Sequence, residues 1–467
     1  MHGRGILGSQ GKYNRKHRQL CQPPFRSPAL LDRFCGTIVE RAERLNEIYA
    51  RRGGATEGDV AVATQRMTLD IIGQVAFSHD FGQLAFHESE VCGTQATAEQ
   101  RANSALVDAV NSFGEELGNI FITPKFALDL MKAAHDPHIE NLESSVETIR
   151  SSMLELIRAR RAELSGILGM APDQIHLAEH GHRLTPSQAG PSSGCPFGFG
   201  ASGAALASMA AATEAPARPP APEEAEVFQP RDLLDMLLMA TDEHGEPMSE
   251  EELWEDVHDV MGAGHETTAT TTAALLYSIV AHPEVYARVQ AEVDRVLGDR
   301  PATFADAERL TYLDSCVKEV LRLYPAIPLF PRVGQDADTL PSGYDVPAGE
   351  VVLMSPWALG RSARLWEDPL VFKPERFDGA EIDRFKWAPF GAGPRMCLGA
   401  NFAILSLTLS VATLLQRTRF ECVSPTTPLI DVGYDMTMQF KKTRGLQMRA
   451  TPRALGLAGR ASASSDA

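Results

Sequence analysis

The chain lacks the features that mark membrane-spanning, disulfide-stapled and nucleic-acid-binding proteins. No apolar run reaches the roughly 18 residues that a transmembrane helix needs. The seven cysteines are odd in number, widely spaced and without a C-x-x-C pair, which argues against a disulfide framework and a structural zinc site. Lys and Arg number 44 against 61 Asp and Glu, and a net charge of −17 makes a phosphate-binding surface for nucleic acid unexpected.

The chain does have enough apolar residues for a large core, 44% of 467. Residues 1–164 predict helices, because apolar positions recur at helical spacing. Between 165 and 228 the composition changes to Ala, Pro, Gly and Ser without a period, which predicts a disordered low-complexity insertion. Residues 229–450 return to helical and short β patterns, and we expect a disordered tail over 451–467. The predicted fold is mainly α with a small β portion.

One long helix is expected to begin at a capping box formed by Ser249 and Glu252 and to run to Pro283. Pro283 then opens a second helix, which Gly298 ends. A third helix is expected over 310–323, followed by a β-like region over 326–356.

The stretch FGAGPRMCLG, residues 390–399, places Cys397 directly before a helical pattern. Unpaired N–H groups at a helix N-terminus favour the thiolate, which predicts a lowered pKa for Cys397. The glycines allow a sharp turn and the close approach of a flat group. On these residues alone a buried structural thiol and a nucleophile both stay open, although no base for a nucleophile lies nearby in the sequence.

The spacing F-x-x-G-x-R-x-C-x-G resembles the haem-binding signature of the cytochrome P450 family. The resemblance implies a haem b whose iron is ligated by the thiolate of Cys397. It also implies that Phe390 packs beside the sulfur, that Arg395 pairs with a haem propionate, and that Gly393 and Gly399 give the cofactor room.

A Glu–Arg pair in the third helix extends the resemblance. Glu319 and Arg322 in KEVLR lie three residues apart on one helical face, and the PERF segment supplies Arg376. Such a pair alone is usually a solvated surface bridge. In the P450 family the corresponding residues form a buried triad, so the resemblance implies a structural role for all three.

The sequence AGHETT, residues 263–268, resembles the family's oxygen-activating motif. We expect Thr267 to bond back to the carbonyl of Ala263 and bend the helix, and Gly264 to leave room for a cofactor. A Thr-rich buried helix face is the alternative. The resemblance implies that Thr267 holds the hydrogen-bond network of bound dioxygen and that Glu266 helps to deliver protons.

Residues 11–20, GKYNRKHRQL, resemble the helix in which a Trp and a basic residue four positions later reach the haem propionates. Tyr13 stands where Trp is usual and His17 where Arg is usual, with Arg18 beside it. The resemblance therefore implies that His17 and Arg18 bind the cofactor. Arg332 in FPRV matches the family's other propionate-binding arginine.

The resemblance implies a cytochrome P450 fold that is N-terminally truncated. In the family a membrane anchor or targeting segment, the first sheet strands and a substrate-lining loop precede the helix at 11–20. We expect the full-length protein to be membrane-associated, in the plastid or the endoplasmic reticulum, with no anchor in this chain. Residues expected to line an apolar substrate pocket are Met261, Ala263, Thr268, Ile327, Pro328, Leu329, Phe330 and Met436.

The activity implied is that of a haem-thiolate monooxygenase, which inserts one oxygen atom of O2 into a C–H bond of a hydrophobic substrate. Residues 67–84 and 263–269 look most like plastid P450s that hydroxylate carotenoid rings; a fatty-acid hydroxylase of the same family is the alternative. A haem-thiolate isomerase or dehydratase and an inactive truncated haem binder are the rivals.

No G-x-G-x-x-G follows a predicted strand, so no reductase module is expected in the chain. Electrons are then expected from a partner protein, a diflavin reductase or a ferredoxin. Arg384 and Lys386, just before the cysteine loop, are expected to help form a basic docking face on a monomeric enzyme.

Overall fold

A computed structural model describes the chain over residues 5–51, 56–121, 123, 125–177, 228–242, 244–379, 382–423, 430–431, 437–440 and 446–453. Helices make up most of it. The α-helices are α1 (Gly11–Cys21), α2 (Pro28–Arg51), α3 (Val60–Phe77), α4 (Gln83–Cys92), α5 (Ala98–Phe121), α6 (Lys125–Ala133), α7 (Pro137–Leu168), α9 (Leu233–Met239), α10 (Glu250–Val280), α11 (Pro283–Leu297), α12 (Phe304–Ala307), α13 (Thr311–Leu323), α14 (Pro356–Gly360) and α15 (Ala400–Arg417). The short 3-10 helices are η1 (Pro23–Phe25), η2 (Ile175–Leu177), η4 (Pro374–Phe377) and η5 (Gly393–Arg395).

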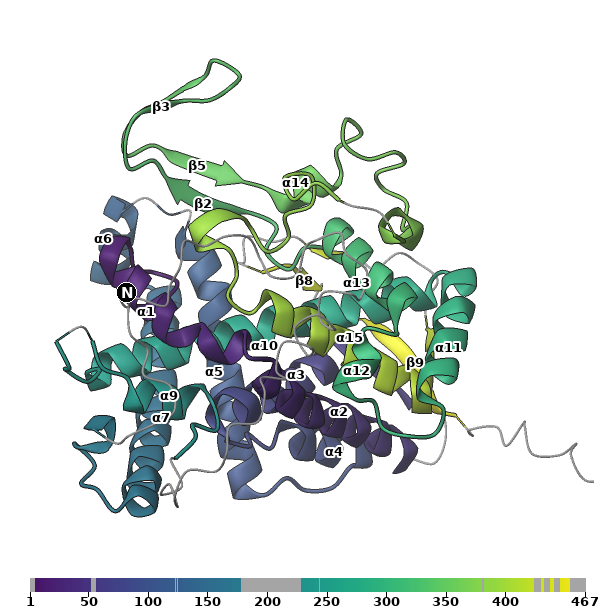
Figure 1. Ribbon diagram of the computed structural model, residues 1–467, viewed down its shortest axis with the longest axis horizontal. Helices are drawn as coiled ribbons and strands as arrows, with labels where there is room; N and C mark the ends of the chain where they lie inside the picture. Colours follow the sequence, from purple (N-terminus) through teal and green to yellow (C-terminus); the bar gives the residue numbers. More distant parts are fainter. Residues whose placement is uncertain are drawn as a thin grey trace, which may run out of the picture.

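The strands are short and lie in small antiparallel sheets. They are β1 (Thr56–Asp59), β2 (Phe330–Val333), β3 (Asp338–Thr339), β4 (Asp345–Val346), β5 (Val351–Met354), β6 (Thr418–Cys422), β7 (Ile430–Asp431), β8 (Gln439–Phe440) and β9 (Gln447–Pro452). Strand β9 is the centre of a sheet in the order β1-β9-β6, while β2 pairs with β5, β3 with β4 and β7 with β8. The β2–β5 hairpin and the loop that carries β3 project from the helical body at the top of Figure 1.

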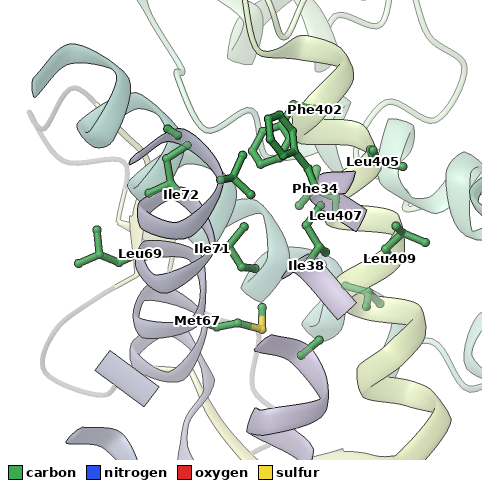
Figure 2. Close-up of a cluster of buried hydrophobic side chains, with 14 of the residues drawn as sticks. Phe34, Ile38, Met67, Leu69, Ile71, Ile72, Phe402, Leu405, Leu407 and Leu409 are labelled. Atoms are coloured by element: carbon green, nitrogen blue, oxygen red, sulfur yellow. The ribbon is translucent and has the colours of Figure 1, made fainter. Parts of the chain in front are cut away.

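The core forms where α2, α3 and α15 face one another. Phe34 and Ile38 of α2 lie opposite Phe402 of α15, and Met67 and Ile71 of α3 point into the same space (Figure 2). All five side chains are buried, and Phe34 meets Phe402 edge to face with ring centroids 6.1 Å apart. This core fixes α15, and with it the cysteine loop that precedes α15.

Helix α10 crosses the middle of the molecule (Figure 1). The predicted capping box is present, because the Ser249 side chain accepts from Glu252 N and the Glu252 carboxylate accepts from Ser249 N. As predicted, α11 begins at Pro283 and ends before Gly298, whose φ of 56° suits a residue without a Cβ. None of the helices that the structure describes is both long and apolar enough to cross a membrane.

Several boundaries differ from those predicted. Helix α7 continues to Leu168, and η2 buries Ile175, so structure extends into the first part of the predicted insertion. The rest of that insertion, residues 178–227, lies outside the described residues. Strand β1, which the helical pattern around it concealed, pairs with β9, and β9 continues to Pro452, within the predicted tail. Residues 454–467 of that tail lie outside the described residues.

Candidate functional site

The loop that carries Cys397 is closed by its own backbone. The amide of Cys397 donates to the carbonyl of Phe390 at 3.0 Å, and the amide of Met396 donates to the carbonyl of Gly393 at 3.0 Å. Gly391 and Gly393 have φ of 69° and 71°, in the left-handed region that favours glycine. Gly399 precedes the first residue of α15 and caps it. The glycines therefore serve the turn itself.

The Cys397 side chain keeps an exposed surface, although the protein atoms around it are dense. Burial raises the pKa of the Cys397 thiol, while the backbone N–H of Gly399 and the positive charge of Arg18 lower it less. The predicted lowering of the pKa is therefore wrong for the chain by itself. The reason is that the cost of burying the thiolate exceeds what the Gly399 N–H and the charge of Arg18 contribute.

Arg18, Arg332 and Arg395 surround this loop and donate to neutral carbonyls. Arg18 Nη2 donates to Met396 O at 2.6 Å, Arg332 Nη1 to Pro331 O at 2.8 Å, and Arg395 to the carbonyls of residues 7 and 9. Burial lowers the pKa of each, with a further lowering of Arg18 by Arg395 and of Arg395 by Arg332. Within the described chain no carboxylate oxygen lies within 4.0 Å of these guanidinium groups. Arg395 therefore repels both Arg18 and Arg332, and no carboxylate among the described residues offsets these three cations.

His17 does not join this group, which corrects the prediction for the first helix. Its ring is fully buried, with Nδ1 2.6 Å from Asp256 Oδ2 of α10, and it stacks on Tyr13 with centroids 4.2 Å apart. Arg18, the next residue, points to the cysteine loop instead. The pair on the loop side of α1 is therefore Asn14 and Arg18, one position later than the predicted pair of Tyr13 and His17. Both pairs have the same i, i+4 spacing, so the sequence alone does not distinguish them.

The predicted triad is assembled, with Glu319 and Arg322 buried and Arg376 half-buried. Arg322 donates from Nε to Glu319 Oε2 at 2.7 Å and from Nη2 to Glu319 Oε1 at 2.8 Å, and Arg376 Nε donates to Glu319 Oε1 at 3.3 Å. The Lys373 amide adds a bond to Glu319 Oε1 at 2.8 Å. Arg322 also donates to the carbonyls of Gly360, Pro369 and Val371. These bonds attach the coil that leads to the cysteine loop to α13.

The middle of α10 shows one predicted contact and corrects another. Thr267 Oγ1 donates to Ala263 O at 2.7 Å, as predicted. Gly264, however, faces α3 rather than a cofactor, because a Cβ there would lie 2.6 Å from Ile72 Cδ1. Its role is close packing of two helices. The half-buried Glu266 points toward α5, with its carboxylate oxygens 3.6 and 3.7 Å from where a Cβ on Gly114 would stand.

The predicted pocket residues divide into two groups. Ala263 and Leu329 are exposed, and Ile327 and Phe330 are half-buried. Met261 is completely buried in the core and Thr268 nearly so, so neither presents a surface to a ligand, contrary to the prediction. Pro328 is also buried, and Met436 lies outside the described residues.

The residues present fit a haem. An accessible thiol next to three uncompensated guanidinium groups matches a metal-bound macrocycle that carries two carboxylates, since the metal keeps the thiol deprotonated and the carboxylates offset the cations. Strand β2 lies beside the cysteine loop, because a Cβ on Gly391 would stand 3.6 Å from Phe330 Cζ and 3.8 Å from Arg332 Nη2.

Comparison with known proteins agrees with the site. The sequence profile of the family described as Cytochrome P450 matches residues 1–176 and 213–443. The chain is 29% identical to the carotene epsilon-monooxygenase, chloroplastic, of Arabidopsis thaliana over 441 residues, which are 91% of this chain and 68% of that protein. It is 39% identical to human cytochrome P450 4V2 over 192 residues, 40% of this chain and 36% of that protein.

The fold has a solved counterpart in the heme domain of cytochrome P450DA. The two structures agree with a TM-score of 0.69 at 21% identity, over 97% of this chain and 81% of that one. At this identity the likeness shows the fold, and the sequence profile, which covers most of the chain, shows the family. The chain belongs to the cytochrome P450 family and is a P450 monooxygenase.

Proposed function

We propose that this P450 inserts one oxygen atom of O2 into a C–H bond of a carotenoid-like substrate, at a haem b ligated by the thiolate of Cys397. The observation that carries the haem assignment is the accessible thiol among three guanidinium groups that have no carboxylate partner in the described part of the chain. The substrate class rests on the likeness to carotene epsilon-monooxygenase, which extends over 91% of this chain.

Each protein group has a separate task in this proposal. Haem, when bound, supplies the activation of dioxygen and the oxidation of the C–H bond. Cys397 supplies the anionic ligand, and Arg18, Arg332 and Arg395 hold the haem carboxylates through charge-assisted hydrogen bonds. Phe390, the half-buried first residue of the loop, has its ring 6.3 Å from that of Trp387 and would pack beside the sulfur.

The proposed proton path begins in the middle of α10. The Thr267 hydroxyl spends its proton on Ala263 O, at 2.7 Å, so its oxygen is left as an acceptor for a water or another donor at the reacting oxygen. Glu266, the preceding residue of the helix, would supply the exchangeable proton through a water that the Thr267 oxygen holds as an acceptor. Apolar substrate is held by the exposed or half-buried residues Ala263, Ile327, Leu329 and Phe330.

The reduced carbon-monoxide difference spectrum tests the haem ligand. The parent protein, supplied with haem, is expected to give the thiolate-type band, and Cys397→Ser is expected to lose it because serine supplies no thiolate. A parent protein without this band contradicts the proposal.

Product analysis tests the substrate. The reconstituted enzyme is incubated with a carotenoid panel and a fatty-acid panel, with O2 labelled as 18O2. Label in a hydroxylated carotenoid supports the proposal. Label only in hydroxylated fatty acids favours the alternative, and a rearranged or dehydrated product without label favours an isomerase or dehydratase.

A further inference from the structure

A short segment before α1 joins α10 to the cysteine loop. Residues Gly5–Ser9, the N-terminal strap, form a turn closed by the bond from Ser9 N to Gly5 O at 3.0 Å. Asn14 of α1 fixes this turn, because its Nδ2 donates to Ile6 O at 2.7 Å and to Ser9 Oγ at 3.1 Å. The strap therefore has a defined shape before it meets either neighbour.

On one side the strap is bound to α10 through Asp259. The Leu7 amide donates to Asp259 Oδ2 at 2.8 Å. The approach is so close that a Cβ on Gly5 would stand 2.6 Å from Asp259 Oδ2 and 2.8 Å from the carbonyl oxygen of Glu255. Only glycine is accommodated there.

On the other side the strap holds the cysteine loop. Arg395 donates from Nη1 to Ser9 O at 3.0 Å and from Nη2 to Leu7 O at 3.1 Å. Leu7 thus bonds in two directions, through its N–H to α10 and through its carbonyl to the loop. A guanidinium carries five N–H donors, so Arg395 keeps donors for a haem carboxylate.

We propose that Asp259 is a positioning residue for the thiolate ligand, an inference that rests on the proposed haem site at Cys397. Asp259 does not touch the loop. It fixes the carbonyls of Leu7 and Ser9 where the Arg395 side chain, two residues before Cys397, is bound between them. Release of the strap leaves the loop free to move and weakens the hold of Cys397 on the iron.

Two substitutions at different places release the same contact. Asp259→Ala removes the acceptor of the Leu7 amide, and Gly5→Ala pushes the strap from α10. We expect the holoenzyme of each variant to release haem to excess apomyoglobin about tenfold faster than the parent, a factor that corresponds to roughly one lost hydrogen bond to a charged group. We also expect part of the reduced carbon-monoxide complex of each variant to lose the thiolate band. Asp259→Asn retains an acceptor oxygen, so this variant is expected to stay close to the parent in both the rate of haem release and the thiolate band.

The controls are matched in chemistry. Gly36→Ala on α2 adds a Cβ with no atom within 4 Å, and Asp108→Asn on α5 alters an exposed carboxylate. Both are expected to leave haem release at the parent rate. Parent-like release and band in both Asp259→Ala and Gly5→Ala overturn the proposal.

Hydrogen exchange separates this proposal from the haem assignment. The amides of Met396 and Cys397 are bonded to Gly393 O and Phe390 O, so their exchange reports the closed loop with or without haem. Faster exchange there in both variants, with α11 at parent rates, supports the positioning role even where the parent shows no thiolate band and the haem assignment fails. Unchanged exchange at 396–397, or an equal rise in α11, overturns it.

Discussion

At the scale of single residues, Glu319 accepts hydrogen bonds from several donors in the C-terminal part of the chain. Its carboxylate receives bonds from Arg322, Arg376 and the Lys373 amide, and it is completely buried. Removing one charge from a buried ion-pair network leaves the remaining charges buried without a partner. The resulting loss of folding free energy is larger than the net stabilisation that the intact network provides.

Glu319→Gln is therefore expected to lower the free energy of unfolding by about 3 kcal/mol or more. Urea denaturation of parent and variant measures the difference. Glu40→Gln, at an exposed position of α2, serves as the control and is expected to stay within about 0.5 kcal/mol of the parent. Equal midpoints for both variants would show that the triad carries no stability.

Asp70 of α3 is a second buried carboxylate, and it links stability to pH. It accepts the amides of Gln83 and Leu84 at the start of α4, at 2.9 and 2.8 Å, and burial raises its pKa to about 7. The pKa in the unfolded chain is about 3.9. Between these values the folded state binds more protons, so the contribution of Asp70 to stability is fully present below about pH 4 and is lost as the pH rises toward 7.

When the pH rises from 5 to 8, the free energy of unfolding of the parent is expected to fall by about 1–3 kcal/mol more than that of Asp70→Asn. Only this difference in slope counts, because Asn leaves one of the two amides without an acceptor and is less stable at every pH. Urea denaturation across the pH range gives the slopes, with Asp108→Asn as the control for an exposed carboxylate. Parallel profiles of parent and Asp70→Asn would contradict the assignment.

At the scale of elements, the contact between α3 and α10 is unusually close. Gly264 admits Ile72, while Thr68 Oγ1 donates to His265 O at 3.1 Å and Thr64 Oγ1 to Ala269 O at 3.2 Å. The hydroxyl bonds and the glycine keep the two backbones near each other, which holds the Thr267 segment in place.

Gly264→Ala is expected to destabilise the protein by about 1–3 kcal/mol through overpacking. The double variant with Ile72→Ala is expected to be less destabilised than the sum of the two single variants, because the two sites are in contact. Gly262→Ala is a control on the same helix, because its added Cβ has no atom within 4 Å. There the gain in helix propensity is expected to stabilise by up to about 1 kcal/mol. Thermal denaturation compares the three; a stabilised Gly264→Ala would disprove the packing role.

The elements also show what the sequence can predict. Apolar spacing, the Ser249 cap and Pro283 located the long helices, because these signals are local. Strand β1 was missed because its pairing partner β9 lies almost 400 positions away in the chain, at residues 447–452. The face of α1 was misjudged for a similar reason: His17 and Arg18 are both basic, and only contacts with Asp256 and Met396 decide which one points to the loop. Gly264 was assigned to a cofactor because the sequence does not reveal Ile72 opposite to it.

At the scale of the whole molecule, the chain on both sides of residues 178–227 is fixed by its own contacts. Arg160 of α7 donates to Asp235 Oδ1 at 2.7 Å and to Asp232 Oδ2 at 2.9 Å, at the start of α9. Ser78 at the end of α3 donates to the same Asp232 carboxylate at 2.5 Å. The two ends of the domain that flank this stretch are thus tied to each other and to α3.

Replacement of residues 178–227 by a flexible Gly–Ser linker is therefore expected to leave the melting temperature within a few degrees of the parent value, since a change in the length of a connection whose ends are fixed changes its closure entropy only slightly. The reduced carbon-monoxide spectrum is expected to stay the same. Arg160→Ala, which breaks the anchor, is expected to lower the melting temperature. A linker variant that unfolds would assign these residues a part in the core.

The net charge of the chain affects where an electron-donor protein can dock on it. The net charge is −17, so an acidic partner is repelled except where basic residues are presented locally. Arg384 is exposed beside Phe385, just before the cysteine loop, whereas Lys386 is half-buried with Nζ 4.2 Å from the centroid of Trp366. Of the two predicted docking residues, Arg384 is thus the one whose charge is free to meet a partner.

Arg384→Glu is expected to slow first-electron reduction by a diflavin reductase or a ferredoxin about tenfold at low salt, with the difference shrinking as salt screens the attraction. Stopped-flow reduction under carbon monoxide at low and high ionic strength measures both effects. Arg295→Glu, an exposed residue of α11, makes the same change in net charge elsewhere and is expected to have a small effect. Equal reduction rates for the two variants at low salt would mean that the partner docks away from the cysteine loop.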